Sequence, residues 1–114
     1  MQKRTDPRDH LPLRPVAFAV LAALAERPLP GIDILDEVNR TVPGRPLLGG
    51  GTLYRLLREL RHARLIERTA RGVDTDDERQ AFHALTAFGR TVMRAEAARL
   101  RRTLDLADET GGRR

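Results

Sequence analysis

The segment that most restricts the possible folds of this chain is residues 52–64, TLYRLLRELRHAR. Leucine recurs there at the spacing of one face of an amphipathic helix, at positions Leu53, Leu56, Leu57 and Leu60. Thr52 is suited to cap this helix, because its hydroxyl can accept a hydrogen bond from a free N–H group of the first turn. Such a helix needs an apolar core on one side, and here it leaves an arginine-rich surface on the other.

Two further helices are predicted before this one. Residues 13–27 are rich in alanine and apolar residues at helical spacing, and Pro28 and Pro30 follow them. Residues 32–42 predict a second, shorter helix. Residues 43–51 then predict a loop that ends in three consecutive glycines.

The rest of the chain predicts a hairpin and a long helix. Residues 65–69 and 80–85 predict two strands around a polar loop. The final helix begins at Thr86 and runs for about 22 residues, or about 33 Å, which is longer than a core of this size requires. Its apolar stripe packs either along its own domain or, as we expect, against the same helix of a second chain, through Val92, Met93, Ala97, Leu100 and Leu104.

Three helices followed by a hairpin predict a mainly α fold with a small β-hairpin, the winged helix-turn-helix arrangement, extended by a long C-terminal dimerisation helix. We expect a flexible arm over residues 1–12 and a winged helix-turn-helix DNA-binding domain over 13–85. The dimerisation helix then covers 86–109, and 110–114 form a frayed tail. In this arrangement the third helix is the candidate reader of the DNA major groove.

The charge distribution favours a nucleic-acid partner. The chain carries 21 basic and 16 acidic residues, a net charge of +5. Residues 45–68 hold six arginines and two glutamates, a net of +4. Clustered arginine is the electrostatic footprint of nucleic-acid binding. The alternative is a solvated helix face in an arginine-rich protein.

Other function classes lack their residues. The chain has no cysteine and no serine, which excludes a thiol nucleophile and a serine hydrolase. Its three histidines are scattered, and no phosphate-binding or dinucleotide motif is present. No apolar run reaches the ~20 residues of a membrane span. We therefore expect a cytoplasmic protein that is not an enzyme, with no catalytic residue, cofactor, metal or membrane partner.

The candidate DNA-binding residues lie before and on the third helix and around the hairpin loop. They are Arg45, Gly51, Thr52, Tyr54, Arg55, Arg58, Arg61, Arg68, Arg71 and Arg79. An arginine can grip guanine through two hydrogen bonds, but phosphate contacts are the more common role. Tyr54 either contacts DNA or half-buries its ring against the core. The loop also carries acids that either repel phosphate or pair with nearby arginines: Asp74, Asp76, Asp77 and Glu78.

Three segments resemble the PadR-like family of transcriptional regulators. They are FAVLAALAERPLPG (18–31), GTLYRLLRELRHARLIER (51–68) and ERQAFHALTAFGRTVMRAEAARL (78–100). The resemblance implies a winged helix-turn-helix, a dimerisation helix and a DNA-binding regulator, here of the family's compact branch. Two positions depart from the family pattern: Ile32 stands where a tyrosine is usual, and Arg64 stands where a glycine often ends the third helix.

From these features we expect a homodimeric, sequence-specific repressor that binds double-stranded DNA at an inverted-repeat operator. Two alternatives remain open, a winged-helix module that binds protein and a DNA-binding protein without sequence preference. The inducer, if one exists, is unknown. The chain has only three phenylalanines and one tyrosine from which to build a pocket for a flat aromatic ligand.

Overall fold

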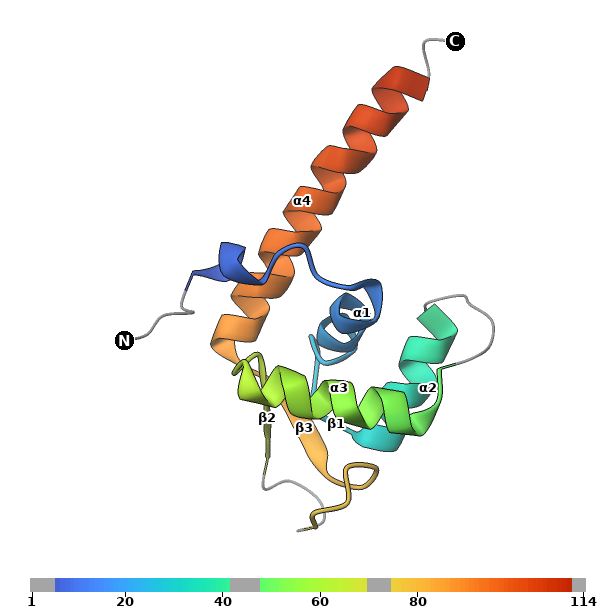
Figure 1. The fold of residues 1–114 in the computed structure, drawn as a ribbon, viewed down its shortest axis with the longest axis vertical. Coiled ribbons are helices and arrows are strands. Elements are labelled where there is room, and N and C mark those ends of the chain that lie inside the picture. Colours follow the sequence, from blue (N-terminus) through green and yellow to red (C-terminus); the bar gives the residue numbers. More distant parts are fainter. Residues whose placement is uncertain (1–5, 42–47, 70–74, 112–114) are drawn as a thin grey trace.

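The structure, a computed structural model, describes residues 6–41, 48–69 and 75–111. In chain order its elements are a 3-10 helix η1 (Pro7–His10), α1 (Pro15–Ala23), β1 (Leu29–Pro30), α2 (Gly31–Thr41), α3 (Gly50–His62), β2 (Ile66–Arg68), β3 (Phe82–Leu85) and α4 (Ala87–Gly111). Figure 1 shows three helices gathered beside a small sheet, while α4 rises out of this body. The described residues therefore form the predicted mainly helical winged helix-turn-helix.

The core lies between α1, α2, α3 and the start of α4. Helix α1 is apolar on all sides, and it contributes Ala17, Ala19, Val20 and Leu21 to the core. The leucine stripe of α3 faces this core, and its four leucines are between 0% and 5% exposed. Val92 of α4 is fully buried in the same cluster. The period-3.6 pattern of α3 thus predicted its buried face correctly.

The sheet has three strands, whereas the sequence predicts a two-stranded hairpin. Strand β3 pairs with β2 and also with β1, both antiparallel, in the order β1-β3-β2. Strand β1 is only Leu29–Pro30, and Pro30 pairs with Phe82. The sequence predicts Pro28 and Pro30 only as the end of the first helix. At the edge of a sheet, however, proline is tolerated because one side of the strand needs no N–H donor.

Helix α3 ends in a left-handed turn at Arg64, where φ is +64°. The Leu65 amide donates to the Leu60 carbonyl and the Arg64 amide donates to the Arg61 carbonyl, at 3.0 and 2.9 Å. This pair of bonds is the Schellman motif, which normally uses glycine at the left-handed position. The family's tight turn is therefore kept although Arg64 has replaced the glycine.

Helix α4 begins at a tight junction with the end of α3. Thr86 caps the helix, because its hydroxyl accepts a hydrogen bond from the Gly89 amide at 2.8 Å. The same hydroxyl donates a hydrogen bond to the Arg64 carbonyl oxygen at 2.8 Å. A Cβ atom at Gly89 would overlap the carbonyl oxygen of Leu65. The Leu-Thr-x-x-Gly turn therefore sets the close approach of α4 to the start of β2.

The predicted flexible arm over residues 1–12 is wrong for the part that the structure describes. Residues 7–10 form η1, with Asp6 as its cap. His10 packs edge-on against Phe88 of α4 with ring centroids 5.4 Å apart. The Leu13 amide donates to the Glu96 carboxylate at 2.9 Å. The arm is ordered because these residues give it both apolar and polar contacts on α4.

Helix α4 has two unlike halves. Its first part is packed against η1 and α1, whereas residues 101–110 are all exposed. The helix has 25 residues and extends through Gly111, so the predicted frayed tail is wrong for residues 110 and 111. At ~1.5 Å per residue, α4 is about 37 Å long.

Candidate nucleic-acid interface

The surface of α3 opposite its leucine stripe is open to solvent. Thr52, Arg55 and Arg58 are exposed on it, one turn apart along the helix. Among the described residues, no acidic side chain pairs with Arg55 or Arg58. Glu59 lies on the same surface and pairs with Arg14 of the chain before α1 at 3.0 Å. The helix thus presents two unneutralised arginines at a protruding surface.

The N-terminus of α3 begins earlier than predicted. Gly49 is the N-cap residue, so the predicted cap role of Thr52 is wrong, and no side chain caps this helix end. Thr52 lies inside the first turn, and its hydroxyl has no partner among the described residues. Gly51 is exposed beside it, and a Cβ atom there would meet nothing within 4 Å. This end of α3 therefore offers free N–H groups and a free hydroxyl, which suit an anion.

Asn39 of α2 sets the position of this helix end. Its side-chain amide donates to the Leu48 carbonyl at 3.1 Å, and its side-chain oxygen accepts from the Leu48 amide at 2.8 Å. These two bonds engage both the C=O and the N–H of Leu48 and so fix the backbone just before α3 begins. The contact of Asn39 with Leu48 could not be predicted from the sequence, because a single asparagine carries no spacing signal for a contact across a loop.

Tyr54 lies partly buried against the core cluster. Its ring covers Gly50, where an added Cβ atom would lie 2.9 Å from the Cε2 atom. The structure thus places the ring in the half-buried position that was one of the two predicted roles. The ring also explains why glycine suits the first residue of α3.

Arg61 and Arg68, two predicted DNA contacts, both bind Glu78. The guanidinium of Arg61 donates to both carboxylate oxygens of Glu78, at 2.8 and 2.8 Å. Arg68 lies 3.3 Å from one of these oxygens and also donates to the carbonyls of Thr75 and Asp76. The prediction that acids of this loop pair with nearby arginines therefore holds for Glu78. No spacing signal predicts this particular pair, because Arg61 and Glu78 are 17 residues apart.

Burial and charge act against each other at Glu78 and His83. Burial opposes ionisation of Glu78, but the hydrogen bonds and charges of Arg61 and Arg68 outweigh it, so the pKa of Glu78 is lowered. Burial also lowers the pKa of His83, although Glu78 favours the charged imidazole. The His83 side chain is 0% exposed, and its Nδ1 atom has no hydrogen-bond partner in the part of the chain that the structure describes. His83 is therefore a buried side chain of β3 whose environment favours the neutral imidazole.

The remaining predicted DNA contacts lie around the hairpin loop and before α3. Arg79 is exposed, and its main-chain amide bonds to Asp77. Arg45 and Arg71 lie outside the described residues, as does Asp74. Arg79 lies in the segment between β2 and β3 and has no acidic partner among the described residues.

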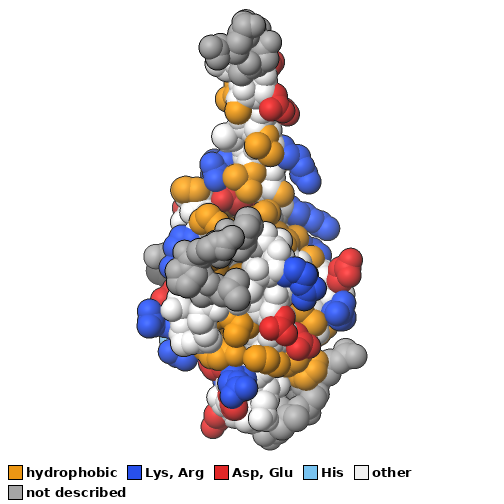
Figure 2. All heavy atoms as spheres, turned by 90° about the vertical axis from the view of Figure 1, so that its right-hand side faces the viewer, with side chains coloured by type: hydrophobic (Ala, Val, Ile, Leu, Met, Phe, Trp, Pro, Cys, Tyr) orange, Lys and Arg blue, Asp and Glu red, His pale blue; other side chains and the backbone are white. Residues whose placement is uncertain are grey.

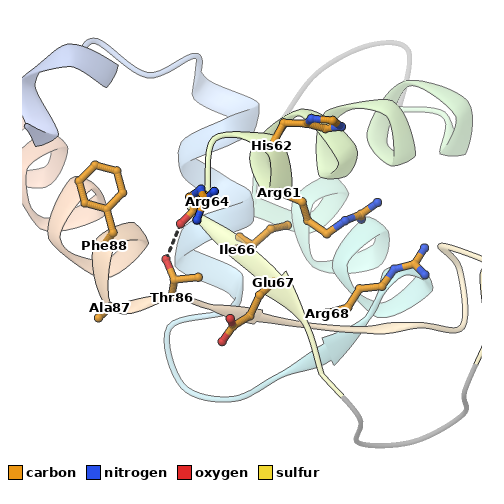
Figure 3. Close-up of a pocket in the computed structure, with 9 residues that line it drawn as sticks. All are labelled: Arg61, His62, Arg64, Ile66, Glu67, Arg68, Thr86, Ala87 and Phe88. Carbon is orange, nitrogen blue, oxygen red and sulfur yellow. Dashed lines mark hydrogen bonds between the residues drawn. The ribbon is translucent and has the colours of Figure 1, made fainter. Parts of the chain in front are cut away.

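A surface hollow of about 740 Å³ lies beside the junction between the C-terminal end of α3 and the start of α4 (Figure 3). It is lined by Arg61, His62, Arg64, Ile66, Glu67, Arg68, Thr86, Ala87 and Phe88. Figure 3 shows the side chains of Arg61 and Arg68 extending to the same side, away from Phe88 and Ala87. Both arginines therefore point toward the hairpin rather than toward α4.

The predicted dimerisation residues divide between two environments. Val92 is 0% exposed and belongs to the chain's own core, so its predicted contact with a second chain is wrong. Met93, Ala97 and Leu100 are partly buried. Leu104 is 61% exposed, as is Leu106 at 64%, which was not predicted. Figure 2 shows hydrophobic side chains along the projecting part of α4, flanked by charged ones.

Glu96 was also missed. Its side chain is 1% exposed and pairs with Arg99 at 2.5 Å. The hydrogen bond from Arg99 lowers the pKa of Glu96 against the effect of burial, with help from the Leu13 amide. A glutamate within an apolar stripe, followed three residues later by an arginine on the same helix, is a sequence signal from which this contact could have been predicted.

These features define a winged helix-turn-helix protein, and comparison with known proteins narrows the class. The profile of the transcriptional regulator PadR-like family matches residues 20–95. The chain therefore belongs to the PadR-like family of transcriptional regulators. No protein of curated function matches the sequence.

Solved structures show the same fold at low identity. A PadR family transcription regulator from Clostridium difficile R20291 superposes with a TM-score of 0.69 at 17% identity, over 83% of this chain and 96% of that one. A PadR-like regulator from Bacillus cereus gives 0.68 at 15% identity, over 83% and 89%. Wild-type ZitR of Lactococcus lactis in complex with DNA gives 0.59 at 21% identity, over 91% of this chain and 64% of that one. The chain spans 62% of ZitR in a further structure.

No helix among residues 6–41, 48–69 and 75–111 is long and apolar enough to cross a membrane. Within the same ranges, no group of three or more histidines and acidic residues is arranged to hold a metal ion.

Proposed function

We propose that this protein is a sequence-specific DNA-binding regulator that acts as a homodimeric repressor. The observation that carries the proposal is the outer face of α3, where Arg55 and Arg58 are exposed without an acidic partner among the described residues. Membership of the PadR-like family supports the same function. ZitR, a protein of similar fold, has been solved with DNA.

In this proposal α3 enters the major groove with its N-terminus foremost. The free N–H groups beside Gly51 and the Thr52 hydroxyl contact a phosphate, because a helix N-terminus carries about half a positive charge. Arg55 and Arg58 then face the base edges or the backbone. A bidentate arginine–guanine contact discriminates against the wrong base by about 1–3 kcal/mol.

The hairpin loop forms the wing and contacts the adjacent backbone. Arg79 is exposed there, and we propose the same role for Arg71 and a phosphate contact for Arg45. Phosphate contacts fix the register of a protein on DNA without reading its sequence. The wing therefore orients α3, and α3 reads the site.

The second chain joins through the projecting half of α4. Leu104 and Leu106 are exposed on it without cover from the described residues. Pairing of two such helices about a two-fold axis sets the two α3 helices about 34 Å apart, one turn of DNA. The operator is then an inverted repeat. Occupancy of a promoter by this dimer represses transcription without any chemical step.

The test is a fluorescence-anisotropy titration against two duplexes at two salt concentrations. One duplex carries the DNA just upstream of the protein's own gene, and the other is a scrambled duplex of the same composition. Binding at least about a hundredfold tighter to the upstream DNA supports a specific regulator, because specific affinity exceeds non-specific affinity by about 10³–10⁷ in such proteins.

Two other outcomes are informative. If both duplexes bind equally with a steep salt dependence, a selection from random duplexes follows: an enriched sequence shows that the target lies elsewhere, and no enrichment contradicts the proposal and indicates a DNA-binding protein without sequence preference. No binding even at low salt indicates a winged-helix module that binds protein.

A further inference from the structure

Glu78 is the centre of an ion cluster that joins three elements of the winged helix-turn-helix. Arg61 reaches it from α3 with two hydrogen bonds of 2.8 Å, and Arg68 reaches it from β2 at 3.3 Å. The Nε2 atom of His83 in β3 lies 3.6 Å from the same carboxylate. One acidic group therefore faces two arginines that both lie on the elements proposed to meet DNA.

The turn that carries Glu78 is fixed by main-chain contacts to α2. The Ile32 amide donates to the Arg79 carbonyl at 2.9 Å, and the Gly31 amide donates to the Ala81 carbonyl at 3.2 Å. A Cβ atom at Gly31 would overlap the carbonyl oxygen of Glu78. The turn that carries the carboxylate is therefore anchored on the start of α2.

The cluster is shielded from solvent. The side chain of Glu78 is 11% exposed, while those of Arg61 and Arg68 are 22% and 32% exposed. A bidentate arginine–carboxylate pair has the same fork geometry as an arginine–phosphate pair. Glu78 thus occupies the positions on Arg61 that a DNA phosphate would otherwise take. It also contributes to neutralising Arg68, whose NH groups donate to the Thr75 and Asp76 carbonyls and which lies 3.7 Å from the Asp76 carboxylate.

We propose that Glu78 is a specificity-determining residue, which withholds Arg61 and Arg68 from DNA phosphates and leaves recognition to Arg55 and Arg58. The proposal rests on the DNA-binding function proposed above. Phosphate contacts increase affinity for every sequence alike. An internal carboxylate that neutralises two arginines beside the reading surface therefore lowers binding to random DNA more than it lowers binding to the operator.

The experiment compares Glu78→Gln with Glu26→Gln on a random duplex over a range of salt concentrations. Both variants lose one negative charge, but Glu26 is exposed and makes no ion pair with a described residue. We expect Glu78→Gln to bind random DNA about tenfold tighter at low salt, with a salt slope steeper by about one to two units, since each new phosphate contact adds about 0.9. We expect Glu26→Gln to remain within about twofold of the wild type, because its charge lies outside the range of direct phosphate contact.

A folded Glu78→Gln variant that binds random DNA no more tightly than Glu26→Gln overturns the proposal. Circular dichroism and thermal unfolding establish whether the variant is folded. If no variant and no wild-type protein binds DNA, the DNA-binding function fails and this inference fails with it. If the wild type binds but Glu78→Gln shows no gain, only this inference fails.

A second variant keeps the test decisive if Glu78→Gln does not fold. The triple variant Glu78→Gln, Arg61→Gln and Arg68→Gln replaces the cluster by neutral amides of similar size. We expect it to bind random DNA with the wild-type salt slope, because the two arginines make no phosphate contact in the wild type. A slope shallower by about two units shows that Arg61 and Arg68 do contact phosphates, which overturns the proposal.

Discussion

Helices α3 and α4 both carry an apolar stripe, but they bury it differently. In α3 the stripe ends where the helix ends, and all four leucines lie in the chain's own core. In α4 the stripe continues beyond the body, so that Val92 is buried while Leu104 is exposed. The comparison teaches that the same sequence pattern can lie wholly in the core of the chain or continue onto an exposed surface, and that helix length decides between them.

The largest difference is expected from removing a leucine inside the body. Leu57→Ala should lower the free energy of unfolding by about 2–5 kcal/mol, because it opens a cavity at a fully buried position. The same substitution at Leu104 should change the unfolding of the monomer little, since that side chain is already in water. Urea unfolding of both variants at low protein concentration measures the difference. Equal losses at the two positions would contradict the contrast between the helices.

A charge on the projecting half of α4 should dissociate the dimer. Leu104→Arg places a guanidinium in the proposed contact between two chains, where burying an unpaired charge is unfavourable. Light scattering should then report a monomer, with the circular dichroism spectrum unchanged. Ala98→Arg is the matched control, because Ala98 is exposed on another side of α4. A Leu104→Arg variant that remains a dimer would show that the interface lies elsewhere.

On α3 the exposed face can be tested without touching the stripe. Arg58→Ala should weaken binding to the operator by about 1–3 kcal/mol if the guanidinium reads a base. If it contacts only a phosphate, affinity for both duplexes should fall together and the salt slope should drop by about 0.9. Arg94→Ala on α4 is the control, since Arg94 is equally exposed. Unchanged affinity and slope would remove Arg58 from the interface.

The smallest expected effect is the acid sensitivity of the sheet beside α3. Because the pKa of His83 is lowered from 6.5, the unfolded chain takes up a proton below about pH 6.5 while the folded chain does not. Stability is therefore complete above this pH and falls below it, by at most about 1.4 kcal/mol per pH unit. The pKa values of Glu78 and Glu96 lie below 4.5, so their contribution is lost only in stronger acid.

The measurement is the unfolding free energy in buffers of about pH 7.5, 6.5 and 5.5. The fall between pH 6.5 and 5.5 should be absent in His83→Gln and present in His62→Gln, because His62 is exposed on α3. A fall that is equal in both variants would assign the acid sensitivity to other groups.

The sequence predicted what depends on local periodicity. The buried face of α3, the order of helices and strands, and the long α4 all follow from apolar spacing. It missed strand β1, which has only two residues and is defined by its partner β3. It also missed the cap at Gly49 and the left-handed Arg64, because these depend on how the chain is held from outside the helix.

Among the candidate site residues, the sequence predicted the exposed arginines of α3 but not how they divide. Arg55, Arg58 and Arg61 follow one another at helical spacing and look equivalent in the sequence. In the structure Arg61 is bound by Glu78 from a distant turn, while the others remain free of acidic partners among the described residues. A contact between residues 17 positions apart depends on the tertiary fold, which periodicity does not encode.

The bond between Leu13 and Glu96 has a consequence for the order in which the molecule assembles. This hydrogen bond joins residues 83 positions apart, and η1, which precedes Leu13, packs against the same helix, α4. During synthesis η1 and Leu13 emerge before α4 does, so the surface that they pack against is missing until α4 has been made. The segment before α1 therefore leaves the ribosome before α4 does, and it reaches its final place only after α4 has formed.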